Sequence, residues 1–228
     1  HAALLGTTLA GMGHKVTLAY LPYPSFDRPF SHFDLRRHNV YARQVLAPAS
    51  DLIHPTSLLD FRRFSADELP FELQNGIREV SIRDTQYTLQ IEQVDTDNHR
   101  SPSGRLFQIR EMRNRRAAAV LYGWLSSLSP EKRPELLLTP NGSILEMGAA
   151  YQTARYLGIP SVTYEFGEQR NRIWLAQNSE VMLQETDDLW EACRNTPLTD
   201  SQWEQIRSLY SSRQNGQLWE NFARLWQG

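Results

Sequence analysis

The chain has 228 residues, of which 40% are hydrophobic and 22% are charged, so it can bury a core without disulfides or a structural metal. Its formal net charge of -2 gives no overall positive field for a nucleic acid backbone, and no apolar stretch approaches the roughly 20 residues that span a bilayer. The single cysteine, Cys193, excludes an intrachain disulfide, and without paired histidines it also argues against a zinc site.

The first predicted elements are a helix and a strand. Apolar residues recur at helical spacing over residues 2–12, Gly13 is a natural C-cap, and residues 16–21 read as a buried strand that Pro22 ends. This is the second half of a β-α-β unit, whose first strand we expect ahead of His1. One cysteine and the lack of a visible signal peptide favour a cytoplasmic protein.

Residues 22–105 are less regular and predict a partly helical insertion. Tyr87, Leu89 and Ile91 alternate with polar residues, which predicts a strand over residues 85–94. We expect helices over residues 34–46, 56–64 and 66–74, a polar loop over residues 95–104, and a long helix over residues 105–128. The short basic runs, Arg36-Arg37, Arg62-Arg63 and Arg113 to Arg116, have acidic neighbours and are interpreted as solvated helix faces rather than nucleic acid contacts.

The clearest pattern is a strand, turn, helix and strand over residues 135–166. Pro140, Asn141 and Gly142 form a turn, Ser143 and Glu146 have capping-box spacing, and Gly158 ends the helix. Such tight connections imply parallel, right-handed pairing. The sequence therefore predicts one α/β domain, with a three-layer Rossmann-like arrangement of helices around a mostly parallel sheet.

The last quarter of the chain predicts a helical tail. Thr199 and Gln202 have capping-box spacing, and residues 217–226 carry an aromatic stripe that we interpret as a packing face. The expected elements are a helix over residues 168–177, a strand over residues 180–184, and helices over residues 187–193, 199–211 and 217–226.

Ligands of parallel sheets bind beyond the carboxyl ends of the strands, and three loops are expected there, one ahead of His1 and two within the chain. The first of the two within the chain contains Asn141, Gly142 and Ser143 and leads into a helix, whose free amides favour an anion or a sugar hydroxyl. The alternative is that Ser143 only caps its own helix.

The second loop is the densest polar cluster in the chain. A carboxylate such as Glu165 can orient a hydroxyl or act as a base, and arginines can clamp a phosphate or a carboxylate. The alternative is a solvated loop with local salt bridges. His1, at a helix start facing the same cleft, is a further candidate base. The candidate binding residues of this loop are Glu165, Glu168, Arg170, Asn171 and Arg172.

Two segments of the chain resemble GT-B glycosyltransferases. Residues 1–19, HAALLGTTLAGMGHKVTLA, resemble the first helix and second strand of that family, through Leu5, Leu9, Ala10, Gly13, His14, Val16 and Thr17. Residues 136–178, with the pattern A-R-x-x-G-I-P, are similar to the later part of the N-terminal domain in bacterial capsule and surface polysaccharide transferases.

The resemblance implies that residues 1–228 form the acceptor-side domain of a nucleotide-sugar-dependent transferase, with residues 199–228 as a helical tail toward a C-terminal donor-binding domain. It implies a sugar or lipid-linked sugar as acceptor, a nucleotide sugar as donor in the complete enzyme, and no cofactor held by this chain. His1 matches a position near the acceptor, no donor-binding residue is assigned, and peripheral association with a membrane is compatible with such an acceptor.

Two other functions remain open at this point. One is a related GT-B enzyme, a sugar-nucleotide epimerase, and the other is a non-catalytic module that binds a glycan or an anion. A product assay with and without an acceptor separates the two enzymes, and turnover separates both of them from the binding module.

Overall fold

The computed structural model describes residues 2–20, 44, 51–61, 64–166 and 173–215. Its helices are α1 (Ala2–Gly11), α3 (Phe71–Leu89), α4 (Pro102–Ser127), α5 (Leu145–Tyr156), α6 (Asp187–Cys193) and α7 (Asp200–Gln214), and its strands are β1 (Val16–Tyr20), β2 (Ile53–Ser57), β3 (Leu137–Pro140), β4 (Ser161–Phe166) and β5 (Ile173–Gln177). Short 3₁₀ helices lie at Leu58–Phe61, Ala66–Glu68, Pro130–Lys132 and Val181–Leu183.

The strands form two small sheets. β1 pairs with β2 in parallel, and β4 lies between β3, to which it is parallel, and β5, to which it is antiparallel. The chain is therefore a mixed α/β protein, as predicted. The described residues do not form the single Rossmann-like sheet that the sequence suggested, because no strand joins β1 to β3 among them.

The β3–α5–β4 unit confirms the pattern over residues 135–166. Leu137 is in register with Ser161 and Pro140 with Tyr164, so the two strands run parallel and end together. Gly158 has a φ of 67°, a left-handed conformation that glycine adopts at low cost after a helix. The predicted helix and strand at the amino end are likewise present as α1 and β1.

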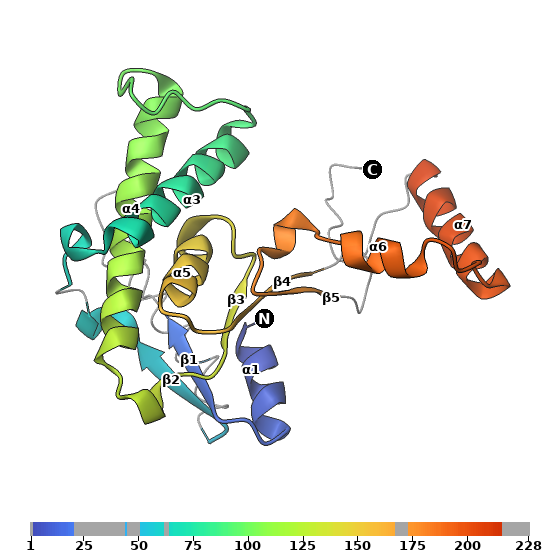
Figure 1. The fold of residues 1–228 in the computed structure, drawn as a ribbon, viewed down its shortest axis with the longest axis horizontal. Helices are drawn as coiled ribbons and strands as arrows, with labels where there is room; N and C mark the ends of the chain where they lie inside the picture. The colour runs from blue at the N-terminus through green and yellow to red at the C-terminus, as the bar shows by residue number, and fades with distance from the viewer. Residues whose placement is uncertain (1, 21–43, 45–50, 62–63, 167–172, 216–228) are drawn as a thin grey trace.

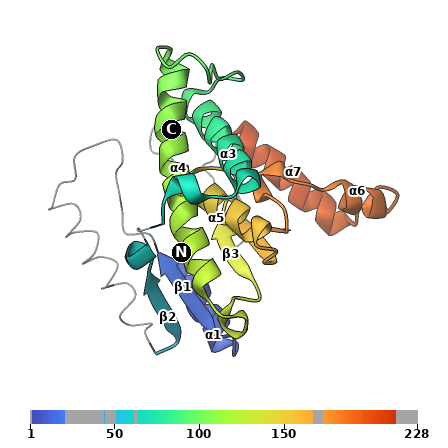
Figure 2. The same ribbon diagram turned by 60° about the vertical axis from the view of Figure 1, so that its left-hand side comes forward.

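A helical hairpin, α3 and α4, packs against α5 and forms the main core (Figure 1). Leu73 and Ile77 of α3 meet Ala118 of α4 and Ala149 of α5 there, and all four side chains are buried. The small alanines let the helices approach closely. Toward its carboxyl end α4 also covers both sheets, so this helix connects the hairpin with the strands (Figure 2).

The predicted strand over residues 85–94 is wrong, because α3 continues to Leu89. Thr85 and Thr88 donate hydrogen bonds from their hydroxyl groups to the carbonyls of Ser81 and Asp84, one helical turn earlier. The alternating pattern placed Tyr87 and Leu89 on one face, yet both are exposed and pack no sheet. The local alternation thus carried no information about burial.

Three other predicted elements differ from the structure. The helix over residues 56–64 is replaced by the end of β2 and a 3₁₀ helix, since Ile53 to Ser57 pair with β1. The helix over residues 66–74 is divided at Pro70, which precedes α3. Residues 180–184 form a 3₁₀ helix rather than a strand, and the predicted helices over residues 34–46 and 217–226 lie outside the described residues.

The predicted helix over residues 168–177 is also wrong where the structure describes it. Residues Ile173–Gln177 form β5, which adds to the free edge of β4 with Ile173 opposite Phe166. An available strand edge outweighs local helix propensity, because the pairing satisfies a whole row of backbone groups.

Helices α6 and α7 form an arm that extends away from the rest of the molecule (Figure 1). Every residue from Met182 to Gln205 is exposed, and the reciprocal capping box of Thr199 and Gln202 is present as predicted. In the part of the chain that the structure describes, no helix is both long enough and apolar enough to cross a membrane.

Candidate functional site

The carboxyl ends of β3 and β4 bring two of the predicted segments together. Pro140 is in register with Tyr164, and the backbone amide of Asn141 donates a hydrogen bond to the backbone carbonyl of Tyr164 at 2.8 Å. The loop that starts at Asn141 therefore lies beside Glu165, the next residue of β4. The sequence placed both segments at this edge, and the structure shows that they are in contact.

Asn141 and Gly142 form a sharp turn in the left-handed region, with φ values of 58° and 81°. A Cβ on Gly142 would lie 2.5 Å from Cγ2 of Thr163, so only glycine fits against β4 here. The Asn141 side chain holds the turn from inside, because its Oδ1 accepts a hydrogen bond from the Ser143 amide at 3.0 Å.

The same asparagine orients the carboxylate of Glu165. Nδ2 of Asn141 donates to Oε2 of Glu165 at 3.3 Å, and Oε1 of Glu165 accepts from the amide of Phe166 at 3.1 Å. Each carboxylate oxygen has further acceptor capacity beyond these bonds. Glu165 is half-buried, so it is both fixed in orientation and reachable from solvent.

Tyr164 precedes Glu165 in β4 and is buried. Burial raises the pKa of the Tyr164 hydroxyl, and the negative charge of Glu165 raises it further. The phenol therefore stays protonated at neutral pH and can act only as a neutral donor or acceptor.

Ser143 does not cap α5, contrary to the capping-box prediction. The helix begins at Leu145 with Ile144 as N-cap and no side-chain cap bond, and Glu146 bonds to Arg113 instead of turning back. Ser143 is 7% exposed, and its Oγ has no hydrogen-bond partner among the described residues. A buried hydroxyl without a partner lowers the stability of the folded state, because its hydrogen bonds with water are lost on folding.

Backbone strain supports the same location. Leu145 has a φ of 55°, a conformation that costs a non-glycine residue about 1–2 kcal/mol. Asn141, Gly142 and Leu145 thus put three left-handed residues into one loop of five. Such strain concentrates at ligand sites, where the surrounding structure holds it in place.

The other predicted site residues cannot be located. Glu168, Arg170, Asn171 and Arg172, together with His1, lie outside the described residues. Among the described residues, no group of three or more His, Cys, Asp and Glu side chains is arranged to hold a metal ion.

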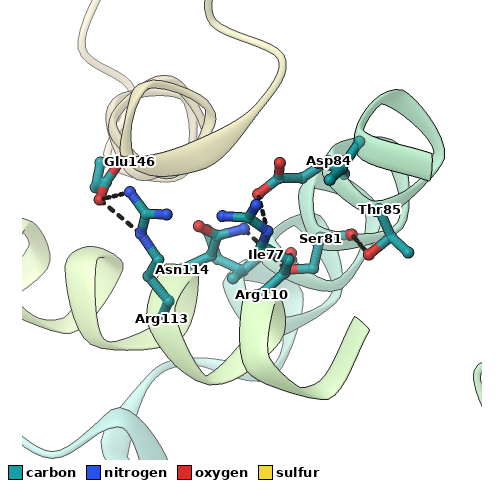
Figure 3. A network of polar contacts seen from close by, with 9 residues as sticks. Ile77, Ser81, Asp84, Thr85, Arg110, Arg113, Asn114 and Glu146 are labelled. Atoms are coloured by element: carbon teal, nitrogen blue, oxygen red, sulfur yellow. Dashed lines mark hydrogen bonds and ion pairs between the residues drawn. The ribbon is translucent and has the colours of Figure 1, made fainter. Parts of the chain in front are cut away.

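A partly buried polar network between α3, α4 and α5 was not expected from the sequence (Figure 3). Oδ2 of Asp84 in α3 lies 3.7 Å from Nε of Arg110 in α4. Arg113 of α4 donates a hydrogen bond to Glu146 of α5 at 2.7 Å. Nδ2 of Asn114 donates to Oγ of Ser81 at 3.1 Å.

This network corrects the interpretation of the basic run at Arg113 to Arg116. Arg113 is paired with Glu146 and Arg115 donates to Gln74, so these two side chains connect helices rather than form a solvated face. The burial of Asn114 could have been predicted from the sequence. It lies seven residues from both Phe107 and Leu121, and therefore on the apolar face of α4. Glu146, in the first turn of α5, ties the start of that helix to α4 and so fixes the loop before it.

Burial raises the pKa of Asp84, while the positive charges of Arg110 and Arg113 lower it in part. The network is thus arranged for structure and is closed to solvent at Asp84. No protein-family model, curated protein or solved structure matches the chain.

Proposed function

We propose that the chain is the acceptor-side part of a nucleotide-sugar-dependent glycosyltransferase of bacterial surface glycan synthesis, and that a sugar hydroxyl of the acceptor binds beside Asn141 and Glu165. The contact between these two side chains carries the proposal. It places an oriented amide and an oriented carboxylate at the carboxyl edge of a parallel strand pair, where α/β proteins bind ligands.

The chemistry of the pair favours a sugar over a free anion. A hydroxyl can donate to a carboxylate oxygen of Glu165 and accept from the amide of Asn141, as neighbouring hydroxyls of a sugar ring do. A phosphate would meet the negative charge of Glu165 at close range, and that repulsion offsets the attraction of the nearby start of α5. The unpartnered hydroxyl of Ser143 supplies a third polar group in the same loop.

The proposed reaction, transfer of a sugar from a nucleotide sugar, is inferred from the resemblance of residues 1–19 and 136–178 to GT-B transferases. The donor nucleotide sugar would be held by a donor-binding domain, and this chain would position the acceptor. Positioning alone contributes substantially to such a reaction, because it removes the entropic cost of bringing two substrates together.

A non-catalytic carbohydrate-binding module is the second candidate, and one observation favours it. Both oxygens of Glu165 already accept hydrogen bonds, from Asn141 and from the Phe166 amide. A carboxylate held in this way is suited to orient a hydroxyl more than to remove its proton.

An oligosaccharide array containing neutral and acidic glycans tests the binding step. We expect neutral glycans to bind, and we expect Glu165→Gln to weaken the best ligand at least tenfold in calorimetry, because a hydrogen bond to a charged group is worth about 1.5–3 kcal/mol. Glu135→Gln is the matched control, since Glu135 is exposed at the opposite end of β3. Equal affinity of the wild type and Glu165→Gln would overturn the site.

A transfer assay then separates the two candidate functions. The full gene product is incubated with the bound glycan and a panel of UDP-glucose, UDP-N-acetylglucosamine and GDP-mannose. Glycan extended by one sugar supports the transferase, whereas binding without transfer from any donor supports the module.

A further inference from the structure

A tryptophan lies next to the candidate binding pair in the sheet. Trp174 of β5 is in register with Glu165 of β4, and the two strands are antiparallel. Side chains at directly opposite positions of an antiparallel pair project from the same face, with their Cβ atoms about 4.5–5.5 Å apart. The indole of Trp174 and the carboxylate of Glu165 are therefore neighbours on one face of the sheet.

The indole of Trp174 is reachable from solvent. The residue is 47% exposed, and it belongs to none of the three apolar clusters that the described residues form. The next opposite pair on the same face is Thr163 and Ala176, and both have small side chains. Among the described residues of β4 and β5, only Glu165 therefore places a large side chain beside the indole on this face.

The polar groups next to the indole carry the argument, because a single exposed apolar side chain needs no explanation. Nδ2 of Asn141 donates to Oε2 of Glu165 at 3.3 Å, and the amide of Phe166 donates to Oε1 at 3.1 Å. An oriented carboxylate thus lies beside an exposed aromatic surface. A ligand that fits both groups has a flat apolar face with hydroxyl groups around its rim.

A sugar ring has this combination of surfaces. Its C–H bonds carry small positive partial charges, so they are attracted to the negative face of an aromatic ring, and the contact removes apolar surface from water. A pyranose with equatorial substituents presents only C–H bonds on its two faces, and its hydroxyl groups point outward around the ring. An axial substituent interrupts the face from which it projects.

We propose that Trp174 determines the specificity of the acceptor site by stacking on the C–H face of a β-linked pyranose with equatorial hydroxyl groups, one of which binds Glu165 and Asn141. The inference rests on the proposed function, since it takes the binding of a sugar hydroxyl by this pair as its premise. It adds an apolar contact to the site and, with it, a preference among neutral sugars.

Calorimetry of the chain with cellotetraose and with α-linked mannotetraose tests the preference. The internal glucose rings of cellotetraose have only equatorial substituents, whereas an α-linked mannose has an axial hydroxyl on one face and an axial linkage on the other. We expect cellotetraose to bind at least about fivefold more tightly, the low end of the effect of a ring stacked on an aromatic side chain. Equal affinity, tighter binding of mannotetraose or no binding of cellotetraose would overturn the inference.

Substitutions of Trp174 test the contact itself. Trp174→Phe keeps an aromatic face and should bind cellotetraose within about threefold of the wild type, whereas Trp174→Leu loses that face and should bind at least about fivefold more weakly. Trp190→Ala is the matched control, because Trp190 is 64% exposed in the arm, and its affinity should equal that of the wild type. Urea unfolding checks that each variant is folded.

The outcomes separate this inference from the proposed function. Unchanged cellotetraose affinity in Trp174→Leu, together with a loss in Glu165→Gln, would overturn the stacking role and leave the polar site in place. Unchanged affinity in both variants would overturn the stacking role and the polar site together.

Discussion

Asp84 is a buried carboxyl group with a shifted pKa. It lies in α3 against Arg110 of α4, with Arg113, Glu146 and Asn114 close enough to influence it. Burial outweighs the two arginines, so the pKa of Asp84 in the folded state is above its ordinary value. The folded protein therefore binds this proton more tightly than the unfolded chain does.

The sign of the pH effect follows from that difference. As pH rises through the raised pKa of Asp84, the ionised carboxyl lowers the free energy of unfolding. Asp84→Asn cannot ionise, so the free energy of unfolding of the variant minus that of the wild type should increase with pH. Urea unfolding between about pH 4 and pH 7 measures this difference. A difference that does not change with pH would contradict the assignment of Asp84.

At the scale of elements, close contact between α3 and α5 controls the candidate site. A Cβ on Gly148 of α5 would lie 2.7 Å from Cγ1 of Val80 and 3.0 Å from the carbonyl carbon of Ser143. Val80 is a stiff, branched side chain and Ser143 contributes backbone, so neither can move easily. Position 148 therefore connects helix packing with the Asn141 loop.

We expect Gly148→Ala to lower the free energy of unfolding by about 1–3 kcal/mol, the usual cost of overpacking a core. Gly11→Ala is the matched control in α1, where a new Cβ meets nothing within 4 Å. That control should be neutral or stabilising by about 0.5–1 kcal/mol, because alanine favours a helix over glycine. Thermal or urea unfolding compares the two, and equal effects would show that α3 and α5 are not closely packed.

The elements that could be predicted are those whose signals are local. Gly13 and Gly158 mark helix ends, and the β3–α5–β4 unit carries turn chemistry on both sides, so these parts follow from residues near in sequence. β5 and α3 depend on distant partners. Residues 173–177 extend because the edge of β4 is free, and residues 85–89 stay helical because α3 packs along α4.

The candidate site was predictable in the same partial way. Asn141, Gly142 and Glu165 were identified because strand ends can be read from turn residues, and the structure adds the bond between Asn141 and Glu165. The role of Glu146 could not be predicted from the sequence, because its partner Arg113 lies 33 residues earlier in the chain. A capping box is a local pattern, and here the long-range ion pair replaces it.

At the scale of the whole molecule, burial is distributed very unevenly. Phe107 in α4 is 1% exposed, with the guanidinium of Arg78 4.9 Å from its ring centre, whereas Trp190 and Trp203 in the arm are 64% and 48% exposed. The stability of this chain should therefore reside in the α3, α4 and α5 core.

Alanine substitutions of these aromatic residues test that distribution. Phe107→Ala should lower the free energy of unfolding by about 3–5 kcal/mol, because it leaves a cavity in the core. Trp190→Ala and Trp203→Ala should each stay within about 0.5 kcal/mol of the wild type, as exposed substitutions do. Urea unfolding measures all three, and a loss above about 2 kcal/mol in the arm would show that these tryptophans are packed in solution.

The central claim is that ligands bind at the carboxyl edge of β3 and β4. Amide chemical shifts of the labelled chain, recorded while a neutral glycan identified on the array is added, test it most directly. We predict that the largest changes fall on Asn141, Gly142 and Ser143 and on Glu165 and Phe166, and that Glu165→Gln removes them. Changes confined to the arm or to α3, with these five amides unmoved, would contradict the claim.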